Sequence, residues 1–391
     1  MKKFTLILAT VALLAAGCSK TEVVGPQNRK GINFAAYTAK TTKAEQEDVT
    51  TGNLSAFEVT AFGNGAIYFD NLTFTKNTVW ESQTKYFWPA FPLTFCAYNT
   101  PIEYDDRAQA TGFARTINTT KQELEVAPAA ELAYQQDLVA AYAAGKKESD
   151  ATNTGNSLSL TFNHYLTQVI VKATNENPAY KVVVDSVKIA NMAGHGIYTF
   201  SHNRMRPIPV NKNSLSSSDY KAGFQKNQEK TLNSTAQEVM PDTDAGKGKW
   251  YLIPQSVTSW DPNTNRHNTN HGTYLALKVK ITTNTVNEAK ALKIYPATAD
   301  ESKGYISGWM AVPIPSGFIF EQGKKYTFTI HFFHNNGNTG AGYVDPEDGS
   351  DLDGDGNAND NGKKILGGEI KFDATVTDWD NNINNNIEIY L

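Results

Sequence analysis

Short segments in which apolar and polar residues alternate recur along most of this chain of 391 residues. A period of two is typical of β-strands that bury one face. Strands and helices do not alternate along the sequence, and only residues 123–144 have a helical spacing of apolar side chains. The pattern therefore predicts an all-β fold of antiparallel sandwiches with one helix. The clearest strand segments are residues 57–62, 93–98, 274–282, 325–333, 369–376 and 387–391.

The segment 85–98, KYFWPAFPLTFCAY, shows how one of these strands begins. Residues 93–98 alternate, whereas Pro89 and Pro92 lack the N–H group that an interior strand position needs. We therefore expect a kinked start followed by a half-buried strand. Trp88 and its aromatic neighbours are expected to fill a core rather than to stack on a ligand.

A change of phase in residues 157–173 indicates where the chain divides. The apolar side chains occupy one parity in the first half of this run and the other parity in the second half. Such a change predicts a bulge, or a strand that passes from one sheet to another. The turn at residues 175–178 follows, so we expect one β-sandwich over residues 44–175 and a second over 176–391, with a long Asp/Gly/Asn loop at 335–364.

The composition excludes several classes of function. Apolar residues make up 40% of the chain and charged residues 19%, which allows a packed core. The formal net charge is −4 and no run of basic residues occurs, so nucleic acid is not an expected partner. The sequence has no GxSxG, HExxH or phosphate-loop motif, and no set of residues indicates an enzyme.

The first residues have the pattern of an export signal. A basic start and an apolar run at residues 4–16 predict a signal peptide over residues 1–17. The last residues of this signal and Cys18 resemble a bacterial lipobox, with Ala15 where that pattern prefers Leu. Cys18 would then carry acyl chains such as palmitate and anchor the protein in the outer membrane. Plain secretory cleavage is the alternative. The other cysteine, Cys96, is expected to be a small buried apolar side chain.

Residues 351–359, DLDGDGNAN, match the first half of a calcium-binding loop. Oxygen ligands stand at alternate positions and Gly356 at the sixth, but Gly362 replaces the Glu of the twelfth position. The prediction is a structural Ca²⁺ site, with a solvated loop as the alternative and no other cofactor. Its candidate ligands are Asp351, Asp353, Asp355, Asn357 and Asn359. The nearby carboxylates that could add ligands are Asp345, Glu347, Asp348 and Asp360.

The histidines do not predict a metal site. His267 and His271 are four residues apart in an Asn-rich loop, and His331 and His334 flank two phenylalanines at the end of a strand. Zinc needs a third and a fourth ligand, and none stands at a recognisable spacing. We therefore expect ordinary surface or strand histidines.

Five segments together resemble the fimbrillin family of Bacteroidales lipoproteins, the subunits of type V pili. Each segment alone is a weak strand pattern, but all five occur in the order of the family and span nearly the whole mature chain. They are residues 85–98, 160–173, 252–256, 313–330 and 368–379.

The resemblance implies two transthyretin-like β-sandwich domains in tandem and a way of assembly. Residues 18–43 would comprise a lipid tether and a removable strand, residues 31–38. A trypsin-like protease would remove this strand and so open an apolar groove. A strand from the next pilus subunit would fill the groove, which satisfies both its backbone and its apolar surface.

The resemblance also implies where the chain is cut and what is donated. The cut would fall between Lys43 and Ala44, where the family usually has Arg, and Lys40 and Arg29 are the other candidates. The candidate donor strand comprises Ile387, Ile389 and Leu391. An ordinary last strand of the second sandwich is the alternative for these residues.

A second function remains open at this point. The protein could be a monomeric surface lipoprotein that binds glycans through a β-sandwich. The candidate stacking residues are Trp250, Trp260 and Trp309, although packing in a core is the usual fate of such side chains.

Overall fold

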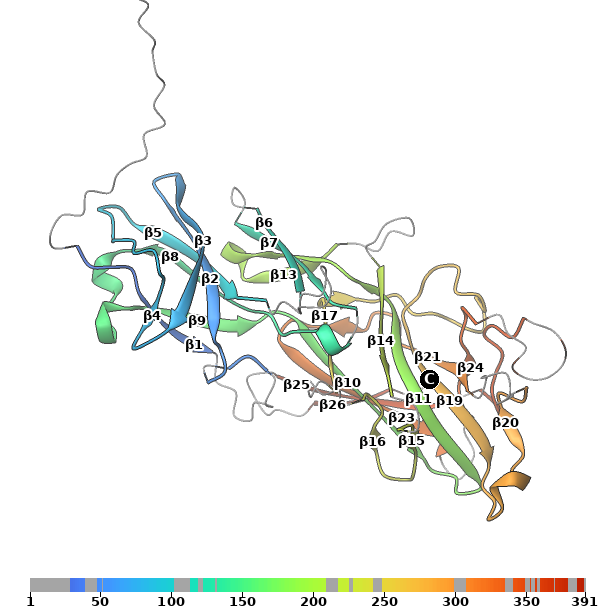
Figure 1. The fold of residues 1–391 in the computed structure, drawn as a ribbon. Coiled ribbons are helices and arrows are strands. Elements are labelled where there is room, and N and C mark those ends of the chain that lie inside the picture. Colours follow the sequence, from blue (N-terminus) through green and yellow to red (C-terminus); the bar gives the residue numbers. More distant parts are fainter. Residues whose placement is uncertain are drawn as a thin grey trace, which may run out of the picture.

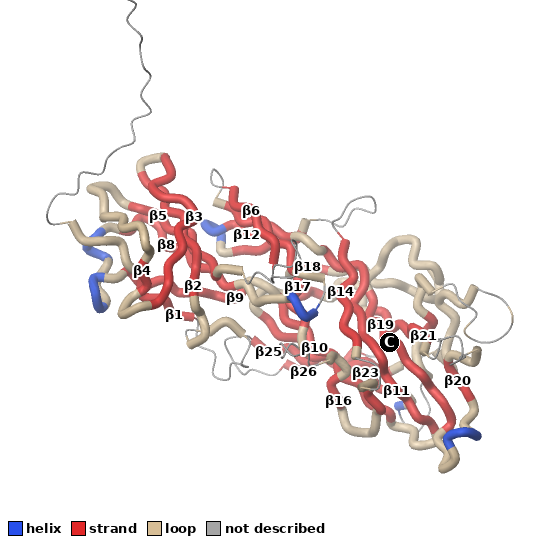
Figure 2. The backbone as a smooth tube through the Cα atoms, viewed as in Figure 1, coloured by secondary structure: helices blue, strands red, loops and turns tan. Residues whose placement is uncertain are grey.

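The fold is composed of strands and short turns (Figures 1 and 2). Five 3₁₀ turns of three residues lie within the described residues, where no helix is long and apolar enough to cross a membrane. They are η1 (Leu132–Tyr134), η2 (Glu148–Asp150), η3 (Thr154–Asn156), η4 (Phe200–His202) and η5 (Glu288–Lys290). The all-β class is confirmed, and the transthyretin-like topology stays a prediction. The computed structural model describes residues 29–38, 48–50, 52–101, 113–118, 122–130, 132–208, 217–224, 228–241, 248–298, 307–334, 340–348, 352, 356, 359–368, 370–378 and 385–389.

The first half of the chain closes into a barrel, where the sequence predicts a sandwich. The strand order is β1-β4-β3-β2-β5-β8-β9. All neighbours are antiparallel except β1 and β9, whose parallel pairing completes the circle. A turn at Asn64 and Gly65, both with positive φ, joins β2 to β3. The strands are β1 (Phe34–Thr38), β2 (Ala56–Gly63), β3 (Ala66–Lys76), β4 (Trp80–Glu81), β5 (Leu93–Asn99), β8 (Val139–Lys146) and β9 (Leu158–His164).

A four-stranded sheet covers part of the barrel and buries the second face of β5. Leu93 and Phe95 of β5 lie in the barrel core, whereas Cys96 and Tyr98 pack in a second cluster with residues of the sheet. The expectation of a half-buried strand was therefore wrong, and Cys96 is confirmed as a buried free thiol, whose pKa burial raises. The sheet has the order β13 (Arg204–Pro207), β12 (Gly196–Thr199), β7 (Glu123–Pro128) and β6 (Phe113–Asn118).

The second half forms a sandwich of two sheets around the largest apolar core. A six-stranded sheet has the order β16 (Gln237–Glu238), β10 (Thr167–Asn175), β23 (Lys324–Phe332), β25 (Lys371–Asp378) and β26 (Asn385–Ile389), with β17 (Trp250–Leu252) also on β10. A seven-stranded sheet has the order β14 (Ser217–Gly223), β11 (Tyr180–Ala193), β19 (Tyr274–Thr283), β21 (Gly308–Pro313) and β24 (Tyr343–Val344), with β15 (Lys230–Thr231) on β11 and β20 (Lys293–Tyr295) on β19. A small pair, β18 (Gln255–Ser256) and β22 (Ile319–Phe320), completes the fold.

The predicted change of sheet falls between β9 and β10. β9 lies in the barrel, and β10 pairs in parallel with β23 of the six-stranded sheet. Tyr165 and Leu166 make the passage and are fully buried in the cluster between the barrel and the four-stranded sheet. The turn at residues 175–178, which the sequence suggests as the boundary, lies one strand beyond this change of sheet.

The predicted helix within residues 123–144 was wrong. The segment contains β7, the turn η1 and the beginning of β8. In β7, the side chains of Leu124 and Val126 are buried while that of Glu125 is exposed, which is the period of a strand. Pro128 could not donate its backbone hydrogen bond inside a helix, so a helix through this segment would be interrupted.

Candidate functional site

Strand β1 completes the barrel, but its two edges are held unequally. On one edge all five residues pair in parallel with β9, and Leu158 N donates to Asn33 O at 2.9 Å. On the other edge, among the residues that the structure describes, the pairing with the two-residue strand β4 joins Phe34 to Trp80. Since backbone pairing holds a strand in its sheet, β1 is fixed chiefly through β9.

The residues before β1 are held by the segment 85–98 that stands out in the sequence. Ile32 N donates to Tyr86 O at 2.8 Å, and Trp88 N donates to Lys30 O at 3.2 Å. The Trp88 side chain is buried and its ring centroid lies 5.6 Å from that of Phe95. The kinked start of β5 thus anchors the chain that leads into β1.

One face of β1 inserts into the barrel core. Ile32, Phe34 and Ala36 are buried, whereas Tyr37 is 47% exposed. The Phe34 ring centroid lies 4.8 Å from that of Phe74 and 5.2 Å from that of Phe95, both in edge-on contact. The side chain of Phe34 is therefore the main apolar contact between β1 and the rest of the barrel.

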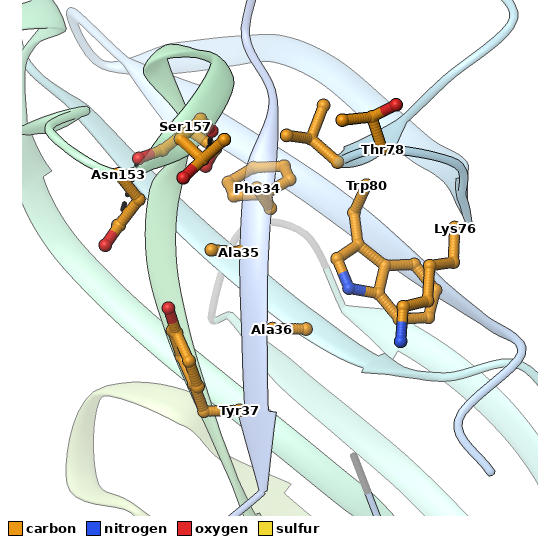
Figure 3. Close-up of a pocket in the computed structure, with 11 residues that line it drawn as sticks. Phe34, Ala35, Ala36, Tyr37, Lys76, Thr78, Trp80, Asn153 and Ser157 are labelled. Carbon is orange, nitrogen blue, oxygen red and sulfur yellow. Dashed lines mark hydrogen bonds between the residues drawn. The ribbon is translucent and has the colours of Figure 1, made fainter. Parts of the chain in front are cut away.

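A cavity of about 220 Å³ runs along β1 where β4 ends (Figure 3). Figure 3 shows Lys76 and Trp80 on one side of β1 and Asn153 and Ser157 on the other side. The Lys76 ammonium lies 6.0 Å from the centre of the Trp80 ring, within the range of a cation–π contact. The space beside β1 is consequently lined by both polar and aromatic groups.

Asp48, which follows β1 by ten residues, is buried in a network of charged and polar groups. Its side chain has no exposed surface. Lys325 Nζ lies 2.6 Å from Oδ2, and Lys249 Nζ lies 3.2 Å from Oδ1. Gln168 Nε2 donates to Oδ1 at 2.8 Å and Tyr251 Oη at 3.2 Å. These partners come from β10, β17, β23 and the residue before β17, so Asp48 is bound to the six-stranded sheet.

The next residue, Val49, connects the same segment to the barrel. Val49 N donates to Asp137 Oδ2 at 3.1 Å, and His164 Nδ1 lies 2.7 Å from the same oxygen. Both side chains are buried. Asp137 lies just before β8, and His164 is the last residue of β9. Residues 48 and 49 therefore lie at the junction of the barrel and the second half.

The ionisation of Asp48 predicts a pH dependence of stability. Burial by itself raises the pKa of Asp48, but the ammonium groups of Lys249 and Lys325 outweigh it and hold the pKa below the ordinary value of 3.8. The stabilisation is therefore complete above pH 3.8 and is lost as the pH falls through the lower folded-state pKa. We expect the urea midpoints of wild type and Asp48→Asn to differ at pH 6 and to converge in strong acid. A constant difference at every pH would contradict this assignment.

The residues predicted for export, processing and donation lie partly outside the described residues. Those outside are Cys18, Lys40, Lys43, Ala44 and Leu391. Arg29 is exposed at the beginning of the described chain. Ile387 and Ile389 lie in β26, an edge strand that pairs with β25 in an antiparallel register. These roles stay predictions.

The predicted calcium loop also lies mostly outside the described residues, and they do not include Asp351, Asp353, Asp355 or Asn357. Asn359 is exposed, and its carbonyl oxygen accepts from Arg266 Nη2 at 3.3 Å. Two of the nearby carboxylates are buried against lysines: Asp345 is 2.8 Å from Lys188 Nζ, and Asp360 is 2.6 Å from Lys363 Nζ. The expectation that these carboxylates add ligands to a calcium site stays a prediction.

Two of the three tryptophans that the sequence offers for glycan stacking are too buried to reach a ligand. Trp250 and Trp260 are fully buried, and the Trp260 ring packs 5.4 Å from Tyr274. Trp309 is half-buried, with the Lys188 ammonium 5.1 Å from its ring centre. Trp250 and Trp260 therefore pack in the core, which is the usual fate of such side chains.

The structure brings together three side chains that the sequence does not connect. Glu176 lies beside His331 and His334, and their ligand atoms are all within 4.8 Å of one another. The sequence separates Glu176 from the two histidines by more than 150 residues. The parallel pairing of β10 with β23 brings them together, and no spacing in the sequence could have revealed it.

Comparison with known proteins gave a matching family model and several similar structures. A family model described as fimbrillin-like matches residues 21–346. A fimbrial protein from Bacteroides vulgatus ATCC 8482 is 15% identical with a TM-score of 0.49, over 78% of this chain and 95% of that one. The fimbrial anchor protein Mfa2 from Porphyromonas gingivalis is 9% identical with a TM-score of 0.31, over 78% of this chain and 92% of that one. A search of curated proteins gave no match.

Proposed function

Because the chain belongs to the fimbrillin-like family, we propose that it is a structural or adhesive subunit of a cell-surface pilus. Other pilus subunits are then its partners, and the cell surface is its location. The observation that carries the proposal is the family match over most of the chain. The unequal attachment of β1 supports a particular way of assembly.

In this proposal, β1 is the strand that is removed. Its loss would uncover the rings of Phe57, Phe74 and Phe95, which now contact Phe34. It would also leave the backbone of β9 without a partner on one edge. An extended segment of a second subunit would restore both the hydrogen bonds and the apolar contacts.

The position of Asp48 supports a cut between β1 and the barrel. A cut between Lys43 and Ala44 separates β1 from residues 48 and 49. After the cut, the piece that begins at Ala44 stays bound through the ion pairs of Asp48 with Lys249 and Lys325. The cut would therefore release β1 while the junction between barrel and sandwich stays intact.

The candidate donor is β26, with Leu391 beyond it. β26 is an edge strand, and its backbone pairs with β25 on one side. Ile387, Ile389 and Leu391 alternate as the inward positions of a strand do. In the precursor, lipid on Cys18 would hold the subunit at the outer membrane until processing.

Limited digestion with trypsin tests the proposal. The protein without its signal and lipid, residues 19–391, is digested and followed by intact mass and by an unheated gel. We expect one early cut after Lys43 and then a ladder of oligomers. Lys43→Gln should abolish both, whereas the matched variant Lys40→Gln should change neither.

Two outcomes contradict parts of the proposal. If residues 39–51 resist trypsin and the protein stays monomeric, β1 is not a removable strand. If the cut is clean but no oligomers form, self-assembly is excluded, and only a role as a tip or accessory subunit is left. Saturable binding of a glycan by the uncut monomer would favour the alternative function.

A further inference from the structure

Two histidines and a glutamate converge at one end of the six-stranded sheet. Glu176 directly follows β10, His331 lies in β23, and His334 stands two residues beyond the end of β23. His331 Nδ1 lies 2.9 Å from Glu176 Oε1, and His334 Nδ1 lies 2.7 Å from Glu176 Oε2. Both imidazoles therefore face the two oxygens of a single carboxylate.

The strand pairing explains this arrangement. Thr174 of β10 pairs with His331 of β23, and Glu176 N donates to Phe332 O at 3.0 Å. Since side chains alternate along a strand, Ile330 and Phe332 enter the core and His331 lies on the opposite face. The cluster is thus built on two paired strands and not on a free loop.

A carboxylate of the third strand faces the other nitrogen of His331. Nε2 lies 3.0 Å from Asp373 Oδ2 of β25, although the two atoms do not form an aligned hydrogen bond. Lys371 Nζ lies 3.3 Å from the same oxygen, so Asp373 is already partly neutralised. Histidines that bind metals commonly give their second N–H to such a carboxylate, which fixes the ring and its tautomer.

The Nδ1 atoms of both imidazoles face the Glu176 carboxylate, and one ligand atom from each of the three side chains lies within 4.8 Å of the others. A single cation can therefore be reached by all three side chains.

We propose that Glu176, His331 and His334 bind a divalent transition-metal cation, with Zn²⁺ as the best fit, and that Asp373 orients His331. Two imidazoles and one carboxylate are ligands that zinc prefers, and water would complete the coordination. Ligand atoms around tetrahedral zinc lie about 3.3 Å apart. The present separations of 2.7 and 2.9 Å need only a small rotation of half-buried side chains.

The bound ion would join the end of β10 to the end of β23 and stabilise the second half of the protein. Binding to the folded chain alone raises its stability by mass action. This inference does not depend on the role in a pilus, because it concerns metal binding by the single chain. Failure of pilus assembly and failure of metal binding are therefore separate results.

Calorimetric titration with ZnCl₂ tests the site. The full protein, purified without a histidine tag and freed of metal, is titrated at pH 7.5. We expect one ion per chain and a thermal midpoint that rises with zinc. Glu176→Gln and His334→Gln should each weaken binding about tenfold or more. The matched double variant His202→Gln/His267→Gln, which removes two exposed histidines elsewhere, should bind as wild type does.

Co²⁺ gives a second readout, because its visible absorption reports coordination by nitrogen and oxygen. The absorption band should form with wild type and disappear with Glu176→Gln. Circular dichroism without metal must show that the variants are folded. The proposal is overturned if wild type binds no zinc with saturation, or if the variants bind it as tightly as wild type.

Discussion

Phe34→Ala is expected to destabilise the barrel by about 3–5 kcal/mol, the usual cost of removing a large buried aromatic side chain. Phe34 has no exposed surface, and its ring contacts those of Phe57, Phe74 and Phe95. The strands around it are fixed in a closed barrel, so they cannot collapse fully into the space that the ring leaves. The urea midpoint of the uncut protein measures this effect.

Tyr37→Ala is the matched control, because Tyr37 lies in the same strand and is 47% exposed. It should cost about 1 kcal/mol or less. In the protein cut after Lys43, β1 is held without a covalent bond to the barrel. In that cut protein, Phe34→Ala should weaken the affinity for the strand by about two to four orders of magnitude. Equal effects of the two substitutions would contradict the importance of the inward face of β1.

Asp48→Ala is expected to cost about 3–5 kcal/mol, because it leaves two lysines at the junction without their shared carboxylate. Lys249 is as buried as a core residue, and its ammonium cannot reach bulk water without movement of the surrounding chain. The urea midpoint, followed by tryptophan fluorescence, measures the loss. Trp250 lies next to Lys249 and is fully buried, so its emission reports the region.

Glu288→Ala is the control for Asp48. It removes an ion pair of similar length, in which Lys181 Nζ lies 2.6 Å from the carboxylate, but the Glu288 side chain is 79% exposed. Water replaces such a partner readily, so stability should stay near that of wild type. The double variant Asp48→Ala/Lys249→Met should recover part of the lost stability, since it also removes one of the two ammonium groups that pair with Asp48. A milder effect at Asp48 than at Glu288 would mean that the buried network contributes little.

The sequence could predict the strands, because their signal is local. Alternation at residues 93–98 and 325–333 needs no knowledge of the partner strand, and the change of phase near Leu166 reports the change of sheet. The same use of a local pattern gave a wrong prediction, a helix, for residues 123–144. There, Leu132, Val139 and Tyr142 have the spacing of a helix. The backbone of residues 123–128 instead pairs with neighbouring strands on both sides.

The barrel and the polar clusters could not be predicted, since they depend on which distant strands meet. Asp48 meets Lys249 and Lys325 only after three strands have assembled, and Glu176 reaches His331 in the same way. One signal for the second buried face of β5 was present. Cys96 and Tyr98 occupy its supposedly polar parity, and both are side chains that proteins often bury.

The parallel pairing of β1 with β9 also bears on the order of folding. Phe34 meets Leu158, a partner about 120 residues later in the chain. Contacts of such long range form slowly, since the intervening chain must first be ordered. Strand β1 is therefore synthesised before most of the barrel but joins the sheet among the last. During this interval the barrel passes through a state that lacks one strand, which is the state that the proposed cut would also create.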